Sequence, residues 1–205
     1  MVTVPRRGVL GGTFNPIHIG HLLVAEEARA ALSLSEVLVV PAGEPWMREG
    51  EKIASKADRW AMVMLAIQYN RKFVPSRVDL DRPGPTYSVD TLSELIAGHT
   101  ENDEGFTCIV GADSLATLPQ WKDPLRLLSM CRIAAVTRPG FDVETAISAL
   151  EQALPGASAH IDVVPGLHIG ISATDIRQRC HEGKSIKYRV PETVESYIME
   201  RGLYR

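Results

Sequence analysis

Two histidines three residues apart, His18 and His21, are the first side chains along the sequence that could do chemistry. They follow the pair Gly11-Gly12 and stand at the expected start of a helix, so both imidazoles can share one face of its first turn. Glycines let a backbone turn sharply and approach a ligand closely. A helix N-terminus offers free N–H groups and a partial positive charge. Together these features predict a phosphate-binding site.

Two other nucleotide motifs are missing from the sequence. Neither GxxxxGK[ST] nor GxGxxG occurs, which argues against a P-loop NTPase and against a nicotinamide-cofactor dehydrogenase. Two further interpretations of the histidine pair remain open. One is an ordinary turn with two surface histidines. The other is a zinc site, which needs a third ligand such as His160, His168 or His181, although nothing in the sequence places these nearby.

A second group of anion-binding side chains lies in the segment Ile171-Ser172-Ala173-Thr174-Asp175-Ile176-Arg177. Ser172 and Asp175 have the spacing of a capping box, which predicts a helix start. Thr174 adds a hydroxyl to the exposed amides there, and Arg177, three residues later, can face the same anion. A capping role alone would also explain Ser172 and Asp175.

Further candidate binding residues follow expected strands. Gly111 allows close approach of a ligand. Asp113 can accept a hydrogen bond from a ribose hydroxyl or can simply cap a helix. Arg48 and Arg138 each come shortly after an apolar run, where Arg48 suits a phosphate and Arg138 suits either a substrate or the strand end. Trp121 either packs in the core or offers its π-face to a cationic ring.

Short apolar runs alternate with helical patterns along the chain. The expected strands cover residues 8–10, 37–40, 73–74, 106–110, 133–136 and 161–164. The expected helices cover residues 21–32, 55–67 with a buried stripe at Trp60, Val63, Met64 and Ile67, then 88–96, 143–150, a helix opened by Ser172 and one beginning near Pro191. This alternation predicts an α/β fold with a doubly wound, Rossmann-like parallel sheet and helices on both faces. Ligands of such sheets bind beyond the carboxyl ends of the strands, at the topological switch point.

Composition limits the class of protein. The 205 residues (22.5 kDa) suit one domain over residues 1–205, with a helical C-terminal portion from about residue 172. The net charge of −3 and the sequence pI near 6.1 give no support for a nucleic-acid partner. Cys108, Cys131 and Cys180 are widely spaced, as in a reducing compartment, and no apolar run approaches the ~18 residues of a membrane span. We therefore expect a soluble cytoplasmic protein with no membrane partner.

Four segments of the sequence resemble motifs of a known family. Residues 11–21, GGTFNPIHIGH, resemble the HxGH signature of the nucleotidyltransferase superfamily of α/β phosphodiesterases, and the pattern looks most like bacterial nicotinate-mononucleotide adenylyltransferases. The segment 171–177 is similar to the family's ISxTxIR block, 111–121 to its GADxxxxLPxW block and 82–92 to its RxGxSYTxDTL block. The four blocks occur in the expected order.

The resemblance implies transfer of the adenylyl group of ATP to nicotinate mononucleotide, giving deamido-NAD and pyrophosphate. It makes His18 and His21 the catalytic residues. It assigns ATP binding to Gly11, Gly12, Thr13, Phe14, His18, His21, Gly111, Asp113, Ile171, Ser172, Thr174 and Arg177. It assigns nicotinate mononucleotide binding to Arg48, Thr86, Tyr87, Trp121 and Arg138. Mg²⁺ is expected to bind through the ATP phosphates and not at a metal site made of protein side chains. A homo-oligomer is compatible with the family.

Local positive charge at the phosphates is expected from His18, His21, Arg48 and Arg177. The chain departs from the family pattern at Asn15, where Asp is commoner, at Met47, where the family has His, and at Trp46, where it has Pro. Three other functions remain open: a transferase for nicotinamide mononucleotide or phosphopantetheine, a truncated aminoacyl-tRNA synthetase, and a module that senses ATP without turnover.

Overall fold

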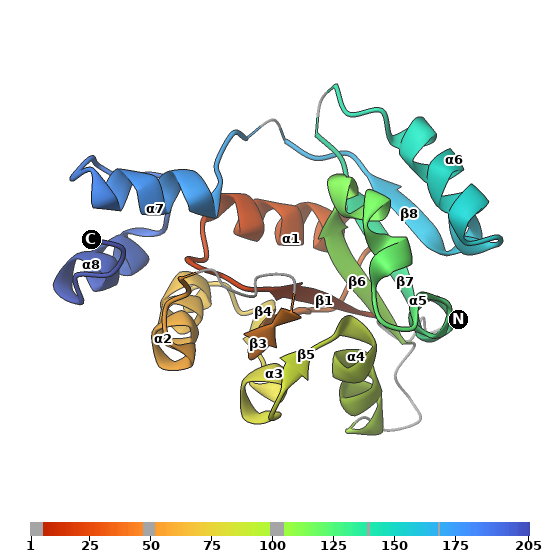
Figure 1. Cartoon of the computed structure of the whole chain (residues 1–205), viewed down its shortest axis with the longest axis horizontal. Coiled ribbons are helices and arrows are strands. Elements are labelled where there is room, and N and C mark those ends of the chain that lie inside the picture. The colour runs from red at the N-terminus through yellow and green to blue at the C-terminus, as the bar shows by residue number, and fades with distance from the viewer. Residues whose placement is uncertain (1–5, 47–51, 99–104, 139, 168) are drawn as a thin grey trace.

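The computed structural model describes residues 6–46, 52–98, 105–138, 140–167 and 169–205. Its centre is a six-stranded parallel sheet in the order β4-β2-β1-β6-β7-β8 (Figure 1). The strands are β1 (Arg7–Gly12), β2 (Val37–Pro41), β4 (Phe73–Pro75), β6 (Phe106–Gly111), β7 (Cys131–Val136) and β8 (Ile161–Val164). Each expected apolar run lies within one of them, so the predicted doubly wound sheet is confirmed.

Helices cover both sides of this sheet. They are α1 (Ile19–Ala31), α2 (Lys56–Ile67), α3 (Val78–Asp81), α4 (Ser88–Ala97), α5 (Pro124–Met130), α6 (Val143–Ala153), α7 (Ala173–His181) and α8 (Glu192–Glu200). The helical patterns predicted all of these except the short α3 and α5. In the described part of the chain, no helix combines the length and the apolar character needed to cross a membrane.

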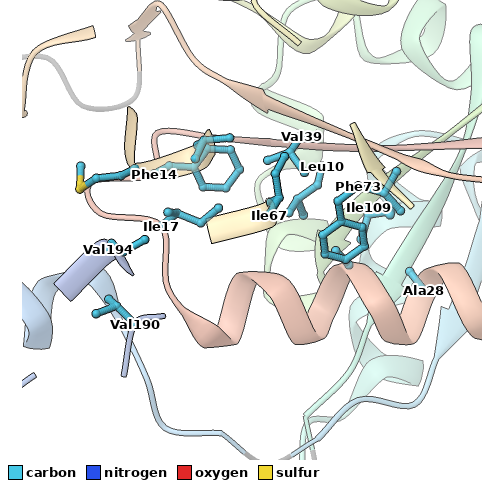
Figure 2. Packing of buried hydrophobic residues seen from close by; sticks show 14 of the residues in the cluster. Leu10, Phe14, Ile17, Ala28, Val39, Ile67, Phe73, Ile109, Val190 and Val194 are labelled. Atoms are coloured by element: carbon cyan, nitrogen blue, oxygen red, sulfur yellow. The ribbon is translucent and has the colours of Figure 1, made fainter. Parts of the chain in front are cut away.

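The core has two halves because alternate strand residues face opposite sides. Leu10 and Val39 belong to one cluster, packed under α1, α2, α7 and α8. Val9 and Val40 belong to the other, packed under α4, α5 and α6. Figure 2 shows Ile17 between the sheet residues and Val190 and Val194, so α8 and the segment just before it pack against the loop that follows β1.

The buried face of α2 includes only two of the four predicted residues, Val63 and Ile67. Arg59, Met62, Val63 and Ile67 are buried, whereas Met64 is 42% exposed. Trp60, expected in the core, is only half-buried and carries the guanidinium of Arg77 at 5.1 Å from its ring. A buried arginine takes the place that an apolar residue would normally fill. A search for regularly spaced hydrophobic residues could not identify Arg59 as buried, because such a search passes over charged residues.

A small second sheet was not predicted. Strands β3 (Glu44–Pro45) and β5 (Pro85–Thr86) pair in parallel. The Thr86 Oγ1 accepts hydrogen bonds from the backbone N–H groups of Gly43 and Glu44, at 3.0 and 3.1 Å. The Thr86 hydroxyl therefore supplements the few backbone hydrogen bonds that two strands of two residues each can form.

Candidate active site

A cavity of about 730 Å³ opens at the carboxyl ends of β1 and β6. These two strands are neighbours in the sheet, but β2 and β4 extend from β1 in one direction while β7 and β8 extend from β6 in the other. The cavity therefore lies at the topological switch point, as expected for a doubly wound sheet. Its volume is in the usual range for a small-molecule site.

Most residues assigned to ligands from the sequence line this one cavity. They are Gly11, Gly12, Thr13, His18, His21, Thr86, Gly111, Asp113, Trp121, Arg138, Ile171, Ser172, Thr174 and Arg177. Two others do not line it: Phe14 is 2% exposed in the core, and Tyr87 is half-buried beside the cavity wall. Arg48, and with it Met47, lies outside the described residues.

The glycine pair differs from its predicted role. Gly11 and Gly12 are the last residues of β1, not a turn, and the left-handed backbone falls on Phe14 (φ 49°) instead. A Cβ on Gly12 would lie 2.9 Å from the Phe14 ring, whereas a Cβ on Gly11 would meet no atom within 4 Å. Gly11 therefore leaves open space in the cavity wall, and Gly12 makes room for Phe14.

The two histidines form one stacked unit at the start of α1. His18 is the N-cap residue, and its ring stacks on the His21 ring with centroids 3.6 Å apart and planes at 21°. The backbone N–H of His18 donates to Nδ1 of His21 at 3.2 Å. Since Nδ1 of His21 accepts a hydrogen bond, the neutral ring carries its proton on Nε2. The Phe14 ring lies nearly perpendicular to the same imidazole, at 5.1 Å between centroids and 88° between planes.

Both histidines are neutral at pH 7. Burial, together with the positive charge of Arg138, lowers the pKa of His18 to about 4. Burial, with the neighbouring His18, holds the pKa of His21 well below its usual range. The expectation that these side chains supply positive charge is therefore wrong for the unliganded protein. They can still donate N–H groups, and Nδ1 of His18 is buried with no partner among the described residues.

The second motif opens α7 and reaches back to the first. Ser172 Oγ accepts from the Asp175 N–H at 3.1 Å, which confirms the predicted N-cap. Arg177 donates through Nη2 to Thr174 Oγ1 at 3.3 Å and through Nη1 to the backbone oxygen of Asn15 at 2.9 Å. The Asp175 carboxylate pairs with Arg189 at 3.5 Å, so it does not complete a reciprocal capping box.

Asn15 occupies a buried hydrogen-bonding position, 4% exposed. Its Oδ1 accepts from the Ala54 N–H at 3.0 Å and from the Tyr204 hydroxyl at 2.9 Å, and its Nδ2 donates to the Lys52 oxygen at 3.3 Å. The amide orientation is fixed because one end meets donors and the other meets a carbonyl. The side chain of Asn15 thus binds other groups of the protein and does not line the cavity.

Arg59 was missed by the sequence analysis. This guanidinium is 1% exposed and donates to four backbone oxygens, those of Thr13, Ala42, Gly43 and Ala54. It ties the loop after β1 to the loop after β2, where both border the cavity. Burial lowers the pKa of Arg59 from its ordinary value. An arginine at i with Met62 and Val63 at i+3 and i+4 is the signal that could have revealed it.

The end of β6 and the turn after it form part of the cavity wall. A Cβ on Gly111 would lie 2.5 Å from Oδ1 of Asp113, so glycine allows this carboxylate to stand next to the strand end. Asp113 is exposed in the first turn of a short 3₁₀ helix, Ala112–Ala116, whose N-cap residue is Gly111. The alternative of a capping aspartate is therefore wrong, and the carboxylate remains available to a ligand.

Three of the predicted mononucleotide-binding residues, Thr86, Trp121 and Arg138, line the cavity. Trp121 lines the cavity and is oriented by the hydrogen bond from its Nε1 to Thr117 Oγ1, 3.3 Å long. Tyr87 lies behind the lining, with the Trp46 ring at 5.8 Å and the Lys122 ammonium 4.7 Å from its own ring centroid. Trp46 also lines the cavity and had been noted only as a departure from the family pattern.

Comparison with known sequences gives consistent results. Residues 9–179 match the family described as Cytidylyltransferase-like. A protein of Roseiflexus sp. (strain RS-1) is 43% identical over 198 residues, covering 97% of each chain. A protein of Acidothermus cellulolyticus is 41% identical over 203 residues, covering 98% of this chain and 94% of its own. Both bear the name "Probable nicotinate-nucleotide adenylyltransferase".

Solved structures show the same fold at low sequence identity. The nicotinic acid mononucleotide adenylyltransferase of Plasmodium falciparum, complexed with NaAD, superposes with a TM-score of 0.76 at 18% identity. It covers 98% of this chain and 97% of its own. The same enzyme complexed with APC gives a TM-score of 0.74 at 17% identity. The likeness extends over essentially the whole fold.

Proposed function

The chain belongs to the cytidylyltransferase-like family, and we propose that it transfers the adenylyl group of ATP to nicotinate mononucleotide, releasing deamido-NAD and pyrophosphate. Full-length relatives that carry the name nicotinate-nucleotide adenylyltransferase support this reaction. The neighbouring structure complexed with NaAD supports the same class of product.

One observation carries the proposal: the first turns of α1 and α7 face one cavity at the switch point. His18 and His21 come from α1, and Ser172 and Thr174 come from the start of α7. Two helix N-termini in one cavity favour an anion with several negative charges, because each adds free N–H groups and a partial positive charge. A nucleoside triphosphate is such an anion.

The chemistry needs positioning more than proton transfer. The phosphate of a mononucleotide has a second pKa of about 6, so it is mostly a dianion at pH 7 and attacks the α-phosphorus without a general base. The neutral imidazoles of His18 and His21 then act as N–H donors to the oxygens that gain charge. Because Nδ1 of His21 is already engaged, its Nε2–H is the donor that faces the substrate.

The leaving pyrophosphate would be held at the start of α7, by the hydroxyls of Ser172 and Thr174 and the guanidinium of Arg177. With both histidines neutral, Arg138 and Arg177 are the arginine or lysine side chains among the described residues that line the cavity. Two cations do not balance a triphosphate, so a site of this charge fits Mg²⁺ bound to the phosphate oxygens. When bound, the ion neutralises charge on the phosphates.

The acceptor would lie beside Trp121. The ring of nicotinate mononucleotide is a cationic pyridinium, and a Trp face binds such a ring strongly. Arg138 and the backbone near Thr86 and Tyr87 are proposed to bind its phosphate and carboxylate. The cytoplasm is the proposed location, while a homo-oligomer and the single-domain organisation stay predictions.

A coupled assay for pyrophosphate release tests the proposal. Purified protein, Mg²⁺ and ATP should release pyrophosphate with nicotinate mononucleotide and much more slowly with nicotinamide mononucleotide or phosphopantetheine. A protein that binds ATP but releases no pyrophosphate with any acceptor would be the ATP-sensing module instead. Release with phosphopantetheine alone would overturn the choice of acceptor.

A further inference from the structure

Tyr204, near the end of the sequence, reaches Asn15 in the loop that follows β1. Helix α8 ends at Glu200 and is followed by a left-handed Gly202 (φ 59°), and the Leu203 N–H returns to the Ile198 oxygen at 3.0 Å. This reversal directs Tyr204 back onto the body of the protein. Its own backbone is left-handed (φ 66°), a conformation that a residue with a side chain keeps only when its surroundings hold it.

The Tyr204 hydroxyl is bound within the protein. It donates to Oδ1 of Asn15 at 2.9 Å, and burial raises the pKa of Tyr204 above its usual range, so the phenol stays protonated. The charged groups that face it are Asp58 and Arg59, both from α2, and Arg177 from α7. Removing the hydroxyl leaves the Asn15 oxygen with one donor, Ala54 N–H, instead of two.

Asn15 passes this restraint to the substrate side. Its backbone oxygen accepts the Nη1 hydrogen bond of Arg177, at 2.9 Å, and the preceding residue, Phe14, packs nearly perpendicular to the His21 ring. Arg177 lines the cavity, whereas Tyr204 and Asn15 do not. An influence of Tyr204 on ligands must therefore be exerted through its neighbours.

We infer that Tyr204 is a positioning residue for the phosphate site: its hydroxyl holds Asn15, and Asn15 holds Arg177 where it can bind the pyrophosphate end of ATP. The identity of the anion rests on the proposed function. Arg177 reaches Thr174 by a 3.3 Å bond as well, so losing the restraint loosens the guanidinium without releasing it.

A matched pair of substitutions tests this inference. Tyr204→Phe removes the hydroxyl that reaches Asn15. Tyr197→Phe removes a hydroxyl from the same C-terminal segment, but one that donates to Asp58 Oδ1 at 2.9 Å and not to Asn15. A merely structural role predicts that both variants lose some thermal stability and that both keep the substrate constants of the unmodified protein.

We expect a different result. Tyr204→Phe should weaken binding of inorganic pyrophosphate and of a non-hydrolysable ATP analogue, measured by calorimetry, by roughly tenfold. It should raise KM for ATP by a similar factor while KM for nicotinate mononucleotide changes less than about twofold. Tyr197→Phe should leave all three within about twofold. Equal constants for the two variants, or equal changes for both substrates, would overturn the inference.

A double variant checks the route through Arg177. In an Arg177→Met background, Tyr204→Phe should weaken pyrophosphate binding no further, because the side chain that it positions is gone. An unchanged tenfold loss in that background would contradict the route. Pyrophosphate binding requires no turnover, so a protein that binds it with this dependence but does not release it from ATP would refute the proposed reaction while supporting the role of Tyr204.

Discussion

Replacing His21 with asparagine separates its two roles. Nδ1 of His21 accepts the His18 N–H at 3.2 Å, while Nε2–H is the donor proposed to face the reacting phosphate. The side-chain oxygen of asparagine stands roughly where Nδ1 does, and nothing in asparagine corresponds to Nε2. His21→Asn should therefore keep the N-cap bond of α1 and lose the donor. His21→Ala loses both, leaving a buried backbone N–H without an acceptor, which costs roughly 1–3 kcal/mol.

The expected loss of rate follows from the role of a transition-state donor. Removing one such donor typically lowers kcat by about 10²–10³, or about 2.7–4 kcal/mol. Pyrophosphate release measures this loss, and thermal unfolding shows whether the fold persists. His21→Gln places an amide N–H near the Nε2 position, so it should recover part of the turnover while losing some stability. Turnover of His21→Asn within about threefold of the unmodified protein would refute the reasoning.

Three further outcomes are expected. The free energy of unfolding should fall as pH drops from 6.5 to about 4, because His18 binds a proton in the unfolded chain but not in the folded protein. The expected loss is on the order of 3 kcal/mol for His18 alone. Above pH 7 this contribution of His18 should no longer change with pH. Gly11→Ala should change the free energy of unfolding by less than about 0.5 kcal/mol but raise KM for ATP roughly tenfold, because its Cβ meets no protein atom within 4 Å and enters the cavity. Gly43→Ala should instead lower the free energy of unfolding by about 1–3 kcal/mol, because its Cβ would lie 2.2 Å from the backbone oxygen of Asp79. Trp121→Ala should raise KM for nicotinate mononucleotide roughly fivefold or more and leave KM for ATP unchanged, whereas Trp60→Ala, away from the cavity, should change neither.

Each outcome has a result that would contradict it. Chemical denaturation between pH 4 and 7 that shows no loss of stability would mean that His18 is charged in the folded protein. A Gly11→Ala variant with normal ATP kinetics would place the triphosphate elsewhere in the cavity. Equal effects of the two tryptophan substitutions on the mononucleotide would remove Trp121 from the binding site.

The sheet could be predicted because its strands are buried on both faces. Residues 37–41, VLVVP, are all buried, and such continuous apolar runs stand out in a sequence. The pair β3 and β5 could not be predicted in this way. Each has two residues, and a threonine hydroxyl 42 and 43 positions away from its donors joins them. That contact depends on the fold being complete.

The site could be predicted where motifs follow strand ends, as for His18, His21 and Ser172. What could not be predicted was the state of these groups. Burial decides the charge of both histidines, and burial is a property of the whole fold. The hydrogen-bond partners of Asn15 and Arg59 could not be predicted either, because they are backbone groups and a side chain that only the completed fold brings near.

The position of β1 at the switch point has a consequence for chain assembly. Gly8 pairs with Val37, a near neighbour in sequence, whereas Arg7 pairs with Phe106, far along the chain. Closing the longer loop costs more chain entropy, and contacts between distant segments slow folding. The cavity exists only after that closure, since β1 forms one side and β6 the other. A nucleotide bound in the cavity would therefore stabilise the pairing of β1 with β6, which is the strand pairing that costs the most chain entropy.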